Sequence, residues 1–315
     1  MHIMTQTAAA IVPAFLLIGA GWLFRQINLI SENLVTGLNR LLFVVVLPIM
    51  LFQKIGSQPL RETFSGALIL GAYISFGLMW LISFAAVKLN GKISPARQGV
   101  IIQGASRPNT IVVGLAVLAE AWGDKVFAPG GMLLGALVPF MNFLAVFALL
   151  LPHRNNSGSK GLSRLFLAVA TNPLIIGAIL GVARSASGIR IPGMFDSAFK
   201  MLSDMAIPAA LLGAGGSLRM DKVRGDFRAS MATSALKLLV MPAIAWAVLA
   251  GMFHLSGMYL GIGVMFASAP VATVSYIMAE QMGGDADLAA SILVITHLLA
   301  IFTMSLWLAS LFRWG

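Results

Sequence analysis

The sequence of 315 residues contains no cysteine. It therefore offers no disulfide bond, no thiol nucleophile and no cysteine-based metal site. Charged residues are scarce, at 10% of the chain, against about 25% in typical soluble domains. Apolar side chains make up 59% of the sequence, and the mean hydropathy is +0.92. A single soluble core cannot absorb this much apolar sequence, so the composition predicts a polytopic membrane protein.

Signatures of catalysis are missing as well. No glycine-rich phosphate loop, metal-binding histidine pair or nucleophile–base arrangement is visible, which argues against an ATP-driven pump. An intramembrane enzyme would need paired catalytic groups at one depth, whereas Asp204, Glu120 and Glu280 are scattered in depth. We therefore expect no enzymatic activity, no cofactor and no bound metal. The net charge of +10 does not indicate nucleic acid as a partner, because the basic residues fall in loops between apolar stretches.

Ten apolar stretches are long enough to cross a bilayer as helices of about 20 residues each. They cover residues 8–25, 34–53, 65–88, 97–121, 129–151, 164–184, 197–217, 228–253, 257–282 and 287–312. The longest polar break, residues 153–161, lies near the midpoint. We therefore expect a first five-helix unit (1–153), a cytoplasmic linker (154–163) and a second five-helix unit (164–315).

The basic residues predict the orientation in the membrane. If the N-terminus is outside, the odd-numbered loops hold eleven Lys and Arg residues and the even-numbered loops hold five. Both termini are therefore predicted outside, in a multi-pass protein of the plasma (bacterial inner) membrane. The first apolar stretch lacks a basic leading region, so we expect it to be retained rather than cleaved as a signal peptide.

The two halves of the chain share a pattern of prolines. Three pairs recur in the same order at a spacing of 160 or 162 residues: Pro13 with Pro173, Pro48 with Pro208, and Pro108 with Pro270. The neighbours agree, since Ala105-Ser106-Arg107-Pro108 matches Ala267-Ser268-Ala269-Pro270. This pattern indicates a duplication. Each copy holds five spans, and an odd number inverts the second copy relative to the first.

Two of the predicted spans are interrupted near their middle. Arg107, Pro108 and Asn109 lie in the span 97–121, with the arginine about 15 Å from water on either side. A cation at that depth must face protein or a water-filled cavity. Pro270 interrupts the span 257–282 in the same way. Inverted repeats with broken helices are typical of secondary transporters, and the free N–H groups of half-helices favour an anion. The alternative is a simple proline kink in each helix.

Motifs along nearly the whole chain resemble those of one known family. They are Leu38-Asn39-Arg40-Leu41 before Leu47-Pro48, Arg107-Pro108-Asn109-Thr110, Ile207-Pro208-Ala209-Ala210-Leu211-Leu212 running to Gly216-Ser217-Leu218, Leu236-Lys237-Leu238-Leu239 with Pro242, and Ala269-Pro270. In this order they resemble the auxin efflux carrier family, including its bacterial malonate-type carriers. Plant members carry Asn-Pro-Asn-Thr-Tyr at the first crossover, where this chain has Arg107 and Ile111 at the outer positions. The difference favours a small carboxylate held by a cation over auxin itself.

The resemblance implies a fold shared with bile-acid symporters and sodium/proton antiporter-like proteins. Spans 1, 2, 6 and 7 would form a scaffold that often dimerises, and spans 3–5 and 8–10 a transport domain that moves against it. The implied function is secondary active transport of a small organic anion by alternating access, of the elevator type and driven by a proton or sodium gradient. The alternatives are a carrier for a bile-acid-like anion and a membrane receptor without transport.

The candidate substrate-binding residues cluster around the two interruptions. They are Arg107, Asn109, Ser106, Pro108, Pro270, Thr273, Ser275, Tyr276 and Asn142. A planar guanidinium can hold a carboxylate through two hydrogen bonds; the alternative is a structural pair between Arg107 and Glu120 or Glu280. Asn109 and Ser106 would either bind substrate or hold unwound backbone. Thr273 could simply cap the second half-helix, and Asn142 could simply bond a neighbouring helix.

A second group of residues is predicted to couple transport to ions or to conformation. It consists of Asp204, Lys237, Glu120, Glu280 and His297. Asp204 and Lys237 lie about 20 Å and about 14 Å from the cytoplasmic ends of their spans, so a buried ion pair is geometrically possible. That pair could be structural or a coupling switch. The two glutamates could bind sodium or lie at the membrane interface, and His297 could relay protons or bond a neighbouring helix.

Overall fold

The computed structural model describes residues 2–57, 64–150, 171, 173–189, 191–218 and 227–314. Throughout these ranges the regular structure is helical, apart from one isolated β-bridge. In the described part of the chain, six helical stretches are long and apolar enough to cross a membrane. The prediction of an all-α polytopic membrane protein is therefore confirmed.

The helices fall on the predicted spans. In the first half they are α1 (His2–Gln26), the continuous run of α2 (Glu32–Leu41), η1 (Leu42–Val46) and α3 (Leu47–Gly56), then α5 (Gly66–Leu89), α6 (Pro95–Ser106), η2 (Thr110–Gly114), α7 (Leu115–Trp122), η3 (Gly123–Val126) and α8 (Phe127–Leu150). In the second half they are α10 (Pro173–Ser187), α11 (Gly193–Gly216), the run of α12 (Phe227–Ala235), η6 (Leu236–Val240), α13 (Met241–Trp246) and η7 (Ala247–Met252), then α14 (Gly257–Ser268), α15 (Val274–Gln281) and α16 (Ala286–Trp314).

Four of the ten predicted spans are weaker candidates for crossing a membrane. The described part of the sixth, α10, has 15 residues. The fourth is divided into α6 and the run of η2 and α7, and the ninth is divided into α14 and α15. The seventh, α11, has 24 residues but carries Asp196, Lys200 and Asp204. The expected linker at 154–163 lies outside the described residues. The count of ten spans, the inverted repeat and the division at the linker remain predictions.

Local sequence explains where several helices begin and end. The hydroxyl groups of Ser31 and Ser65 accept hydrogen bonds from the amides of Leu34 and Leu68, so each serine caps the first turn of its helix. Gly123 ends α7 with a positive φ of 71°, a conformation that glycine adopts without a steric penalty.

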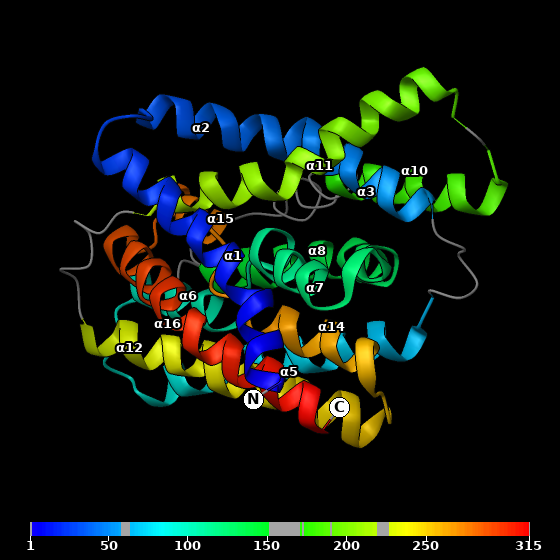
Figure 1. Cartoon of the computed structure of the whole chain (residues 1–315). Helices are drawn as coiled ribbons and strands as arrows, with labels where there is room; N and C mark the ends of the chain where they lie inside the picture. The colour runs from blue at the N-terminus through cyan, green and yellow to red at the C-terminus, as the bar shows by residue number, and fades with distance from the viewer. Residues whose placement is uncertain are drawn as a thin grey trace.

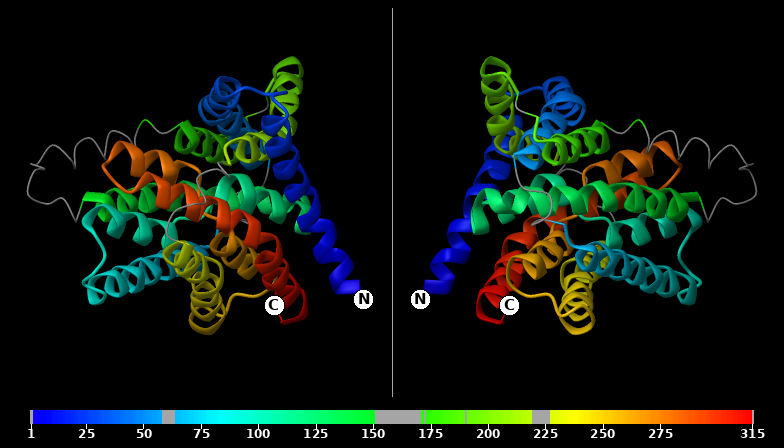
Figure 2. Two further views of the ribbon diagram at one scale, coloured as in Figure 1. Left: turned by 90° about the vertical axis from the view of Figure 1, so that its left-hand side faces the viewer. Right: turned by 90° about the vertical axis from the view of Figure 1, so that its right-hand side faces the viewer.

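A first group of helices, α2, α3, α10 and α11, lies on one side of the molecule in Figure 1. The helices α5, α12 and α14 lie on the opposite side, with α6, α7 and α8 between, and α1 runs from the first group across to the far side. In the first group α10 packs on α3, and α11 packs on α2, α3 and the neighbouring α1. Figure 2 shows the same arrangement from two sides, with both chain ends lying close together.

Small residues let α1 approach the first group closely. A Cβ atom built on Gly21 of α1 would overlap the backbone of Leu212 in α11, and one built on Gly215 would overlap the carbonyl of Ile18. Such contacts are typical of membrane helices, where packing rather than hydrophobic burial drives association. The crossing of α1 and α11 is therefore fixed by the absence of side chains at these two glycines.

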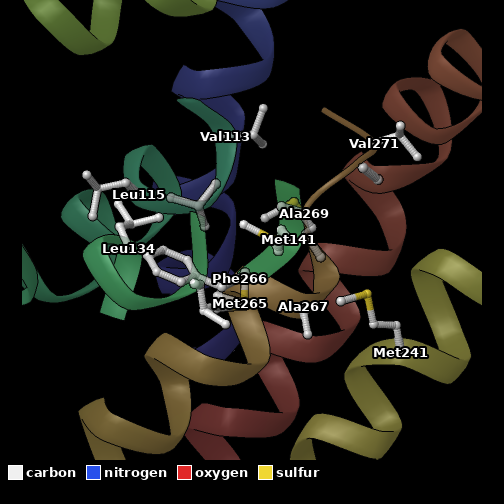
Figure 3. Packing of buried hydrophobic residues seen from close by; sticks show 14 of the residues in the cluster. Val113, Leu115, Leu134, Met141, Met241, Met265, Phe266, Ala267, Ala269 and Val271 are labelled. Atoms are coloured by element: carbon white, nitrogen blue, oxygen red, sulfur yellow. The ribbon is translucent and has the colours of Figure 1, made fainter. Parts of the chain in front are cut away.

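The apolar core surrounds the two interrupted helices. Phe266 at the end of α14 is fully buried, and its ring packs against Gly114 and Gly130. Figure 3 shows Leu115 and Leu134 beside the same ring. The half-helix that follows the first interruption is thus packed against the half-helix that precedes the second.

Candidate functional site

Both interruptions exist, and they lie against each other. The first separates α6 from η2 at residues 107–109, and the second separates α14 from α15 at residues 269–273. The amide of Asn109 donates to the carbonyl oxygen of Pro270 at 2.7 Å, and the amide of Ala272 donates to that of Arg107 at 3.1 Å. Between these bonds Pro108 and Val271 form an antiparallel bridge. Each unwound segment thereby satisfies backbone groups of the other, as the membrane interior requires.

Side chains from two other helices support the second interruption. Thr296 of α16 accepts a hydrogen bond from the amide of Val271 at 3.3 Å. Lys237 of η6 is 0% exposed, and its Nζ donates to the carbonyl oxygen of Ala267 at 2.5 Å. The amide of Val271 and the carbonyl of Ala267, which lie on either side of Pro270, therefore have partners.

Asn109 and Ser106 hold the backbone of the first interruption. The Oδ1 atom of Asn109 accepts from the amide of Val112 at 3.3 Å and caps η2. The hydroxyl of Ser106 donates to the carbonyl of Ile102 at 2.8 Å within α6. The buried Nδ2 atom of Asn109 has no hydrogen-bond partner in the structure, so it can donate to a further group.

Arg107 is buried, with 8% of its surface exposed. Its Nη2 donates to Oδ1 of Asn142 in α8 at 2.6 Å, and its Nη1 contacts the sulfur of Met278 in α15. Within the residues that the structure describes, no carboxylate pairs with this guanidinium. The alternative pairing with Glu120 or Glu280 is not formed, and both glutamates are exposed.

The face of α6 that carries Arg107 packs on α15. One turn before Arg107, the Nε2 of Gln103 donates to the carbonyl oxygen of Ser275 at 3.0 Å. The Oε1 of Gln103 and the hydroxyl of Ser275 are buried and have no partner. Buried polar atoms are nearly always hydrogen-bonded. These atoms, together with Asn109 Nδ2, have the capacity to hydrogen-bond a polar ligand.

The remaining candidates after the second interruption are less central. Thr273 occupies the N-cap position of α15, but its side chain makes no capping hydrogen bond. The hydroxyl of Tyr276 lies 3.3 Å from Oε1 of Glu280 and donates to it. His297 of α16 is buried; its Nδ1 lies 2.8 Å from the carbonyl oxygen of Leu293, and its Nε2 has no partner.

The ion pair that the sequence allows between Asp204 and Lys237 is not formed. Asp204 is exposed on α11, whereas Lys237 is buried and bonds Ala267. The depth of each residue in its span placed the two within reach of each other. Depth, however, does not give the direction in which a side chain leaves its helix, and here the two directions differ.

Three residues of the site escaped the sequence analysis: Gln103, Met278 and Thr296. Gln103 could have been found, because it precedes Arg107 by four residues and so lies on the same helix face. Met278 and Thr296 carry no comparable signal, since an apolar side chain and a single hydroxyl are ordinary in membrane helices.

Comparison with known proteins gives one consistent result. The family described as membrane transport protein matches residues 7–308. The uncharacterized transporter YfdV of Escherichia coli (strain K12) is 26% identical, with the alignment covering 94% of this chain and 97% of the relative. The putative malonate transporter of Rhizobium meliloti (strain 1021) is 21% identical, over 96% of this chain and 95% of the relative. The chain therefore belongs to the membrane transport protein family, the auxin efflux carrier family that its motifs resemble, and it is a multi-pass membrane transporter.

Proposed function

We propose that this chain is a secondary active transporter that moves a small organic anion by alternating access. The observation that carries the proposal is Arg107, a buried cation at the paired interruptions whose described partners are the uncharged side chains of Asn142 and Met278. A buried charge without a counter-charge is costly. A carboxylate of the substrate would supply that counter-charge.

The groups around Arg107 suit a small carboxylate. The guanidinium can turn its planar fork toward two oxygen atoms, while Asn109 Nδ2 and the Ser275 hydroxyl are free to donate. Gln103 Oε1 is free to accept. The name of the Rhizobium relative, putative malonate transporter, supports malonate as the first compound to test.

We further propose that the chain crosses the membrane ten times, as two inverted five-helix repeats with both termini outside. The first group of helices, α2–α3, α10 and α11, together with α1, would form the scaffold and the homodimer contact. The helices α5–α8 and α12–α16 would form a transport domain that carries both interruptions in an elevator movement. The gathering of α2, α3, α10 and α11 on one side of the molecule in Figure 1, with α11 packed on α1, supports this division.

Flux measurements in proteoliposomes test the function. Uptake of labelled malonate, succinate, indole-3-acetate and taurocholate would be compared for the parent, Arg107→Ala and Arg107→Lys. We expect saturable uptake of a small carboxylate by the parent and a loss of at least about tenfold in Arg107→Ala, because a hydrogen bond to a charged group contributes about 1.5–3 kcal/mol.

Arg25→Ala is the matched control, since Arg25 pairs with Glu32 at the start of α2, away from the interruptions. It should transport as the parent does. Specific binding without flux of any anion would identify a receptor instead. Uptake of taurocholate alone would identify a carrier for amphipathic anions.

A further inference from the structure

Among the residues that the structure describes, Lys237 is a charged side chain that is completely buried, at 0% exposure. It belongs to η6, and its Nζ donates to the carbonyl oxygen of Ala267, in the last turn of α14. Figure 3 shows Ala267 at this end of α14, with Met241 of α13 reaching toward it. The lysine therefore bridges the helix before the second interruption to a neighbouring helix.

The carbonyl of Ala267 needs a partner because the helix stops there. In a continuous helix it would accept from the amide of Val271, four residues on. That amide donates to Thr296 instead, and Pro270 has no N–H to offer. The end of α14 thus exposes carbonyl oxygens and the negative end of the helix dipole to the interior.

A cation is the natural occupant of such a position. In carriers with interrupted helices, half-helix carboxyl ends and unwound carbonyls coordinate sodium or protons. Among the described residues no carboxylate pairs with Lys237, and no three His, Asp or Glu side chains gather as a metal site. The Lys237 ammonium therefore faces the carbonyl oxygen of Ala267 and the negative end of the α14 helix dipole, and both attract its positive charge.

The first interruption has no counterpart of this lysine. The offset of 162 residues that relates Pro108 to Pro270 relates Ser75 to Lys237. Ser75 is buried in α5, and its hydroxyl donates to the carbonyl of Gly71 in its own helix at 2.7 Å. In the described ranges each interruption thus has one buried cation: Arg107 lies on the first unwound segment, and Lys237 reaches the second from another helix.

We propose that Lys237 is a built-in cation of the second interruption. Its ammonium group occupies the carbonyl end of α14, the kind of position at which other carriers with interrupted helices bind a cation. This chain would then need no sodium ion to hold the interruption in place or to bind its anion. The structural part of the proposal stands on the contacts of Lys237 alone. The consequence for transport rests on the proposed function.

Thermal unfolding of the purified protein in detergent tests the structural part. For the parent, the apparent Tm should be the same in sodium chloride and in choline chloride at equal ionic strength. Lys237→Ala should lower the apparent Tm by about 5 °C, because it removes a charged hydrogen bond. Methylammonium chloride, which fits the space left and carries N–H donors, should restore part of that loss, whereas tetramethylammonium chloride should not.

Three further variants keep the test decisive. Lys237→Arg retains a cation and should be closer to the parent than the uncharged Lys237→Met. Lys200→Ala removes an exposed lysine of α11 and should respond to none of the ammonium salts. Saturable stabilisation of the parent by sodium would overturn the proposal even if Lys237→Ala did not fold. Equal stability of Lys237→Met and the parent would overturn it as well.

The transport consequence is measured separately. Malonate uptake that depends on Arg107 and is unchanged when choline replaces sodium on both sides supports the proposal. Uptake that depends on Arg107 but requires sodium contradicts it and leaves the proposed function intact. If no anion is taken up while the Tm responses are as expected, the role of Lys237 stands and the proposed function fails.

Discussion

The amide nitrogen of Asn109 lies 2.7 Å from the carbonyl oxygen of Pro270 and donates a hydrogen bond to it. The amide of Ala272 donates a second bond to the carbonyl of Arg107. These two bonds hold the unwound segments side by side in antiparallel directions. Neither segment can shift alone without breaking hydrogen bonds that the apolar surroundings cannot replace. Binding of an anion at Arg107 would therefore affect the position of the unwound segments in both halves of the chain.

Removing the hydroxyl of Thr296 should loosen the second interruption. Thr296→Val keeps the shape of the side chain but leaves the buried amide of Val271 without an acceptor, at a cost of about 1–3 kcal/mol in stability. Thr303→Val in the same helix is the control, because the Thr303 hydroxyl donates only to the carbonyl of Leu299. The apparent Tm should fall clearly for Thr296→Val and little for Thr303→Val; equal effects would show that the bond to Val271 is unimportant.

A carboxylate placed beside Arg107 should compete with the substrate. Asn142→Asp puts a negative charge 2.6 Å from the guanidinium with almost no change in shape. The apparent affinity for malonate should fall by about tenfold or more, about 1.4 kcal/mol, while stability is kept or improved by the new ion pair. Asn142→Ala, which adds no charge, should weaken binding less. Anion binding is read by the ligand-induced rise in Tm, and unchanged affinity in Asn142→Asp would argue against Arg107 as the anchor.

Two glycines of α1 should respond differently to the same substitution. In Gly21→Ala the new methyl group would overlap the backbone of Leu212, whereas at Gly19 nothing lies within 4 Å of the added Cβ. Overpacking of this kind costs about 1–3 kcal/mol, so Gly21→Ala should lower the apparent Tm and Gly19→Ala should not. If Gly19→Ala is the more damaging change, the close crossing of α1 and α11 is wrong.

Much of the site could be predicted from local sequence. The proline, arginine and asparagine at 107–109 predict an interruption because each is costly in an apolar helix. The second interruption became visible only by comparing the two halves, since Ala269 and Ser268 beside Pro270 look ordinary alone. Both interruptions can be predicted because proline lacks an N–H group and so breaks the helical hydrogen-bond pattern whatever surrounds it.

The partners across the site could not be predicted in the same way. Helices that are apolar all round give no periodic signal for the direction of a side chain. For this reason the sequence suggests Asp204 as a possible partner of Lys237, where the structure has the carbonyl of Ala267. In the same way it suggests Glu120 or Glu280 for Arg107, where the structure has Asn142 and Met278. Contacts between helices distant in sequence decide both cases.

An experimental structure with the transported anion bound tests the central claim most directly. We expect a carboxylate of malonate, or of whichever small anion is taken up, within about 3 Å of the Arg107 guanidinium. We also expect Asn109 Nδ2 or the Ser275 hydroxyl to donate a hydrogen bond to the same anion. An anion bound elsewhere, with Arg107 still held by Asn142 and Met278 as in the free protein, would contradict the claim.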